Sequence, residues 1–249
     1  MLKKLARAIF CALALNGVAA PVAAVPIQAV FTGTVYGSFD KTGLFGGAGG
    51  SLDGQAFTMT FKYDTALGQR SNAGPSTYDN VIGSTRFGLS NPTISATLQI
   101  GSQSRSILGD YFSQYQMCDD GYPLYCGVDQ YYANAEDYLT QPGGSYTLNR
   151  FVINFWDYLE FLPDNLDTPF SMLVSGSVGQ DSRFIFASYD AALGTYPVYT
   201  YGGLTVSSLT VGPVVPPVAP VPLPAAGGAL LAALAAIGVL RGRRPRLTT

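Results

Sequence analysis

The sequence has 249 residues, of which 47% are hydrophobic and 12% charged, and it carries a formal net charge of −2. This length allows one or two domains. The sequence contains no histidine, which excludes Ser-His-Asp and Cys-His catalysis and every metal centre that is ligated by histidine.

The first 24 residues have the layout of a secretory signal peptide. Lys3, Lys4 and Arg7 precede an apolar run, and small residues follow it. We expect cleavage after Ala24, with Ala20 as the alternative. A retained N-terminal anchor is the other interpretation, but the apolar run is short for a membrane span of about 20 residues.

Residues 25–211 show the period of two that is typical of β-strands. In 55–63, Phe57, Phe61 and Tyr63 fall on one face, and small or polar residues fall on the other. The same pattern predicts further strands at 28–36, 94–100, 146–156, 170–178, 183–188 and 197–211. Turns are expected between them, one of them at Gly202-Gly203. A single short helix is expected at 131–139, and the fold class is therefore all-β, an antiparallel β-sandwich of jelly-roll type.

Cys118 and Cys126 are the two cysteines outside the predicted signal peptide. In an exported chain such a pair predicts one disulfide, since a metal site would need more soft ligands than this region offers. Asp119, Asp120 and Asp129 crowd the loop between and after the cysteines. Hard cations take oxygen ligands from such loops, so a Ca²⁺ site and a solvated acidic loop are both open interpretations.

Tyrosines are concentrated in the same segment. A tyrosine presents a flat face and a hydroxyl at little entropic cost, and sugar rings stack on such faces. Packing of these rings in the core is the other interpretation. The candidate carbohydrate-binding residues are Tyr111, Tyr115, Tyr122, Tyr125, Tyr131 and Tyr132, with Tyr138 at the end of the segment.

Asp157 and Glu160 flank the single tryptophan, Trp156. Glycosidases need only two carboxylates, so this pair is the first candidate for hydrolysis of a glycosidic bond. Catalysis also needs a cleft and one raised pKa, and neither is visible in the sequence. We therefore expect no catalytic residue and no enzymatic activity, and we keep a two-carboxylate hydrolase as the alternative.

Basic residues are gathered at the two ends of the sequence. Three of the 14 basic residues lie in 1–24 and four in 221–249, so seven remain in 25–220. All 16 acidic residues lie in this middle region. An acidic middle region argues against nucleic acid as a partner. It favours solubility, divalent cations or neutral partners.

The last 29 residues have three successive parts. A Val-Pro-Leu-Pro-Ala motif is followed by a segment to Leu240 that is wholly apolar or glycine, and then by arginines. Counted from the start of the motif, the apolar stretch is long enough to cross a hydrocarbon core of about 30 Å, and the arginines would stay cytoplasmic. A buried helix fits poorly, because the segment has no polar face. The motif residues are Val221, Pro222, Leu223, Pro224, Ala225, Arg241, Arg243 and Arg244.

These three parts, in this order, resemble the VPLPA-CTERM sorting signal, a relative of the PEP-CTERM signal. The resemblance covers residues 221–249. It implies a Gram-negative bacterium, recognition by an exosortase-type membrane enzyme, and delivery to the cell surface or the extracellular polysaccharide matrix.

The expected organisation is a signal peptide at 1–24, a β-sandwich passenger at 25–211, a stiff spacer rich in valine and proline at 212–220, and the sorting signal with its transmembrane helix at 221–249. The precursor would be anchored in the inner membrane. The expected function is a non-enzymatic surface or matrix protein that binds extracellular polysaccharide. A purely structural adhesin or spacer is a further alternative.

Overall fold

The computed structural model of the protein describes residues 25–72, 78–118, 128–157, 162–163, 165–174 and 179–215. The chain divides into one unit that ends at Val214 and another that begins at Val215, and every strand below belongs to the first. The predicted signal peptide, the predicted sorting signal and residues 216–220 of the predicted spacer lie outside the described residues. Over the ranges given, no helix has the length and apolarity to span a membrane.

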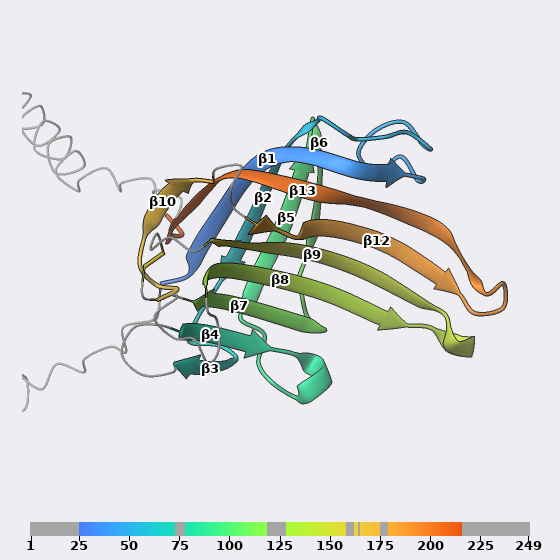
Figure 1. The fold of residues 1–249 in the computed structure, drawn as a ribbon. Coiled ribbons are helices and arrows are strands. Elements are labelled where there is room, and N and C mark those ends of the chain that lie inside the picture. Colours follow the sequence, from blue (N-terminus) through green and yellow to red (C-terminus); the bar gives the residue numbers. More distant parts are fainter. Residues whose placement is uncertain are drawn as a thin grey trace, which may run out of the picture. The chain divides into compact units, whose positions relative to one another are not determined.

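The described residues form one antiparallel sheet (Figure 1). Its strands are β1 (Ile27–Asp40), β2 (Ala56–Tyr63), β3 (Gln69–Asn72), β4 (Tyr78–Gly83), β5 (Thr93–Ile100), β6 (Gln103–Ile107), β7 (Phe112–Cys118), β8 (Asp129–Thr140), β9 (Tyr146–Asp157), β10 (Phe170–Leu173), β11 (Gly179–Gln180), β12 (Ser182–Asp190) and β13 (Thr195–Pro213). Short 3-10 helices lie at Thr85–Phe87 and Pro142–Gly144. The strand order is β3-β4-β7-β8-β9-β12-β13-β1-β2-β5-β6, and β10 and β11 pair with β13 and β9.

The sheet curls, so that β2, β5 and β6 cross behind the layer of β7, β8, β9, β12 and β13 (Figure 1). Strand β6 also contacts β8. Aromatic rings from the two arms meet there. The ring of Phe61 on β2 lies 6.0 Å from that of Tyr115 on β7, and Phe31 on β1 lies 5.6 Å from Tyr131 on β8. The two arms of one sheet therefore enclose a single core, as two separate sheets would in a sandwich.

The expected antiparallel all-β class is confirmed, but both layers belong to one continuous sheet. Strands β1 and β13 pair from Ile27 opposite Pro213 to Asp40 opposite Thr200, with register shifts at two places. Such irregularities bend a strand and increase its twist, which lets a long central pair pass from one layer into the other. The strand order consequently differs from that of a jelly roll, which has two four-stranded sheets.

The short helix expected at 131–139 is wrong, because this segment lies within strand β8. The strand pairs with β7 on one side and with β9 on the other. Alternate side chains, those of Tyr131, Ala133 and Ala135, face the core and are fully buried. Pairing on both edges and the burial of every second residue are properties of a central strand.

The turn expected at Gly202-Gly203 is also wrong, because both glycines lie inside β13. A Cβ atom on Gly203 would lie 2.4 Å from Cζ of Tyr36, so the ring of Tyr36 occupies the space of a side chain. Glycine at this position reflects close packing against a neighbouring ring. Strand β13 also continues through Gly212 and Pro213, so the predicted spacer at 212–220 begins inside the strand.

Candidate functional site

The outward face of the sheet carries the side chains that alternate with those of the core. On β12, Phe184 and Phe186 point into the core, whereas Ile185 and Ala187 line the groove on the opposite face, with Ile185 half-buried and Ala187 buried. Ile185 lies opposite Tyr201 on β13, and Ala187 lies opposite Tyr199 on the same strand. The outward face of β12 is thus bordered by tyrosines of β13.

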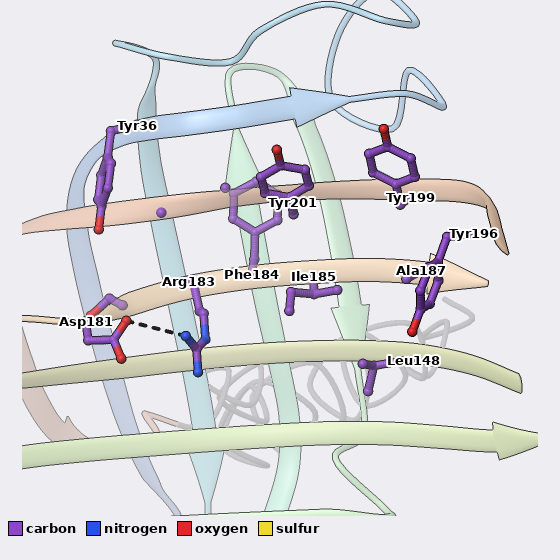
Figure 2. A pocket seen from close by; sticks show the side chains of 13 residues that line it. Tyr36, Leu148, Asp181, Arg183, Phe184, Ile185, Ala187, Tyr196, Tyr199 and Tyr201 are labelled. Atoms are coloured by element: carbon purple, nitrogen blue, oxygen red, sulfur yellow. Dashed lines mark ion pairs between the residues drawn. The ribbon is translucent and has the colours of Figure 1, made fainter. Parts of the chain in front are cut away.

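A groove of about 520 Å³ follows this face. Figure 2 shows Tyr36, Tyr201 and Tyr199 spaced along one side of it and Tyr196 at its end, near Ala187. Arg183, Ile185 and Ala187 on β12 lie beneath the row, and Leu148 on β9 lies at the other side. Gly202 and Gly203 also line the groove. The ring of Tyr36 lies over Gly203, and a side chain at Gly202 would instead meet the buried ring of Phe184.

Three of the four groove tyrosines are exposed to solvent, and Tyr199 is partly exposed. The exposed fractions are 49% for Tyr36, 44% for Tyr201 and 42% for Tyr196. The rings of Tyr199 and Tyr201 are stacked with centroids 6.0 Å apart. A row of exposed rings over an apolar floor is the kind of surface that marks a binding site rather than a part of the core.

Hydrogen bonding and stacking hold Tyr196 at the end of the row. Its hydroxyl lies 2.5 Å from that of Tyr146. This hydrogen bond raises the pKa of Tyr146 to about 12. Tyr146 in turn stacks on Tyr138 and Tyr189, with centroids 4.9 and 5.1 Å away. The aromatic surface therefore continues across β12, β9 and β8.

The loop after β1 places a lysine beside the groove. The ammonium of Lys41 lies 5.0 Å from the centroid of the Tyr199 ring and 3.5 Å from the backbone oxygen of Tyr196. Asp40, the preceding residue, is fully buried. Its carboxylate accepts hydrogen bonds from the backbone N–H groups of Leu44 and Phe45 and from the hydroxyl of Thr200, at 2.7 to 2.9 Å. Asp40 thus anchors the glycine-rich loop from which Lys41 extends.

We expect this anchor to be sensitive to acid. Burial raises the pKa of Asp40, but the hydrogen bonds from Phe45, Thr200 and neighbouring groups outweigh it and hold the pKa below that of an ordinary aspartate. A lowered folded-state pKa means that the stabilisation is complete above the unfolded pKa of about 3.9 and is lost as the pH falls through the folded pKa. Asp40→Asn should cost about 2 kcal/mol at pH 7. Urea unfolding of both proteins between pH 7 and pH 3 measures this, and a difference that does not shrink below about pH 4 would contradict it.

Charged side chains lie in the groove and beside it. Arg183 forms an ion pair with Asp181 at 3.6 Å. On β9, beside Ile185, Arg150 pairs with Glu136 at 3.3 Å. Burial raises the pKa of Glu136, and the nearby Arg150 and Arg86 partly oppose this.

Beyond the groove, the outward face becomes a surface of amides. The side-chain amide of Gln130 donates to that of Asn154 at 2.7 Å, and Gln114 donates to Asn80 and Gln116 at 3.1 Å. Amides carry both donors and acceptors. This part of the face is therefore equipped for hydroxyl-rich ligands, although its groups already bond to one another.

The tyrosines predicted from sequence do not form one site. Tyr115 and Tyr131 are fully buried core residues, so the core interpretation holds for both. Tyr111 is partly exposed and lies 4.9 Å from Tyr138 in the aromatic surface, and Tyr132 is partly exposed on β8. Tyr122 and Tyr125 lie outside the described residues.

The predicted disulfide and metal site fall largely outside the described residues. Cys118 is buried at the end of β7, whereas Cys126, Asp119 and Asp120 are not described. Asp129 is buried, and its carboxylate accepts a hydrogen bond from the N–H of Leu162 at 3.4 Å. In the described part of the chain, no three acidic or cysteine side chains are grouped so that they could hold a metal ion. The disulfide and the Ca²⁺ site stay predictions.

The carboxylates proposed for the alternative hydrolase are equally untested. Asp157 is the last residue of β9, and Glu160 lies outside the described residues.

Comparison with protein-family models, with curated proteins and with solved structures found no match for this chain. Sequence reasoning missed the groove tyrosines, Tyr36, Tyr196, Tyr199 and Tyr201. One signal could have found two of them, because Tyr199 and Tyr201 are two residues apart on a predicted strand and Gly202-Gly203 follows directly.

Proposed function

We propose that the chain is an exported, non-enzymatic protein of the cell surface or extracellular matrix, which binds polysaccharide in the groove lined by Tyr36, Tyr196, Tyr199 and Tyr201. The observation that carries this proposal is the row of exposed tyrosine rings over an apolar floor. The alternation of residues along β12 and β13 supports it, because one face of each strand is left for a ligand while the other builds the core.

The chemistry of the groove suits a sugar chain. A pyranose ring has apolar C–H faces that stack on tyrosine, and its hydroxyl groups bond to phenols and charged side chains. The volume of about 520 Å³ lies within the roughly 300–1,000 Å³ that is usual for ligand sites. The rings follow the strands one after another (Figure 2), which favours an extended polymer over a compact small molecule.

Targeting is the second part of the proposal and depends on the resemblance of residues 221–249 to the VPLPA-CTERM signal. The precursor would be exported through the segment 1–24, held at the inner membrane by the C-terminal helix, and handed to an exosortase-type enzyme. A sandwich-like passenger that binds polysaccharide would then act in the matrix to which that signal directs its proteins.

The binding proposal predicts that Tyr199→Ala combined with Tyr201→Ala weakens binding to the producing organism's extracellular polysaccharide at least ten-fold, about 1.4 kcal/mol. Both substitutions remove stacking surface and leave the core unchanged, since the two side chains point outward. Affinity electrophoresis of the full-length protein measures the change, in a detergent without a sugar headgroup.

The matched control is Tyr132→Ala, which removes a partly exposed tyrosine of the same sheet face outside the groove. It should bind like the wild type. If the control loses binding and the double variant keeps it, the site lies in the Tyr111–Tyr138 segment and the groove proposal is wrong.

A further inference from the structure

Arg183 stands inside the groove with most of its hydrogen-bonding capacity unused. A guanidinium has five N–H donors. Within the ranges that the structure describes, the polar contact of Arg183 is the single ion pair with Asp181 at 3.6 Å, and the two side chains are 47% and 58% exposed. Arg70 provides the contrast, because it makes two hydrogen bonds to Asp79 at 2.9 and 2.5 Å.

The ion pair of Arg183 is easily replaced. Exposed pairs of this kind contribute little to stability, because water screens both charges. Arg183 and Asp181 are also the only basic and the only acidic residue among the described side chains that line the groove. Lys41 adds a positive charge above Tyr199. The charges of Arg183 and Asp181 cancel, so the positive charge beside the groove comes from Lys41, on a chain whose region 25–211 is strongly acidic.

We propose that the groove selects acidic polysaccharide, and that Arg183 is the residue that determines this specificity by binding a sugar carboxylate. The planar fork of a guanidinium matches a carboxylate in a bidentate geometry. The carboxylate would take the place of Asp181 on Arg183, while neighbouring sugar rings stack on Tyr36 and Tyr201. This inference rests on the proposed function and names the ligand class for the same groove.

Two substitutions with opposite expected effects test it. The ligands are polygalacturonate and its fully methyl-esterified form, which has the same backbone without the charge. The full-length wild-type protein should bind the acid form at least ten-fold more tightly than the ester. Arg183→Gln should abolish this preference, whereas Asp181→Asn should strengthen binding of the acid form several-fold. Neither substitution should change binding of the ester.

Each result distinguishes the inference from the proposed function. Equal binding of acid and ester by the wild type, or an unchanged preference in Arg183→Gln, overturns the acidic specificity and leaves polysaccharide binding intact. Binding of neither polymer by the wild type also overturns it, and the assay with the organism's own polysaccharide then decides the proposed function separately. Both residues are about half exposed, so unchanged thermal unfolding should verify that the variants are folded.

Discussion

Arg70→Met is expected to destabilise the folded chain by about 3–5 kcal/mol, because it leaves a buried carboxylate without its counter-charge. Asp79 on β4 is fully buried. The guanidinium of Arg70 on β3 contacts both of its oxygens and also donates to Asp167 at 2.8 Å. The N–H of Leu166 donates to Asp79 at 2.9 Å. The cluster therefore connects an edge hairpin of the sheet to the turn at 165–168.

Denaturant unfolding of the full-length protein measures the loss. The control is Asp167→Asn, which removes the partner whose side chain is 44% exposed and should cost less than about 1 kcal/mol. The double variant Arg70→Met with Asp79→Asn should recover part of the stability, since no charge is then buried alone. A loss for Arg70→Met no larger than that for Asp167→Asn would show that solvent reaches Asp79.

Tyr131→Ala is expected to cost a similar amount, about 3–5 kcal/mol, because it opens a cavity in the middle of the core. The ring of Tyr131 is stacked on Phe155 at 5.8 Å and meets Phe31 edge to face at 5.6 Å. Its hydroxyl lies 3.4 Å from that of Tyr63. Burial raises the pKa of Tyr131 well above that of an ordinary tyrosine.

Tyr131→Phe is the matched variant, because it keeps the ring and removes only the hydroxyl. It should cost about 1 kcal/mol, the contribution of one buried hydrogen bond. Polysaccharide binding should be unchanged in Tyr131→Phe. Loss of binding in a folded Tyr131→Phe protein would instead restore the Tyr111–Tyr138 segment as the ligand site.

The strands themselves were largely predictable, and the reason is local. A strand with one buried face needs apolar residues at every second position, and this pattern is visible in 55–63 without knowledge of any partner strand. Each of the seven predicted strands overlaps an observed strand. Some of the strands that were missed, such as β3 and β11, are short. Others, such as β6 and β7, contain several polar residues that weaken the apolar alternation.

Strand β8 shows where the local signal fails. Its inward positions after Tyr131 are Ala133 and Ala135, and alanine favours a helix at least as well as a strand. Only the pairing with β7 and β9 decides between the two structures. Gly202-Gly203 is a second case. The pair has the sequence of a turn, but in the structure both glycines lie inside β13 and the ring of Tyr36 packs against Gly203.

From the sequence alone, one could derive the period of two, the all-β class, the absence of histidine chemistry and the resemblance of the last 29 residues to a sorting signal. The tertiary structure decided which tyrosines are buried and which form a surface. The groove combines residues of β1, β9, β12 and β13, and the Arg70 cluster joins residues 97 positions apart. Local alternation tells the two faces of one strand apart, but it contains no information on which strands become neighbours, and that choice creates the site.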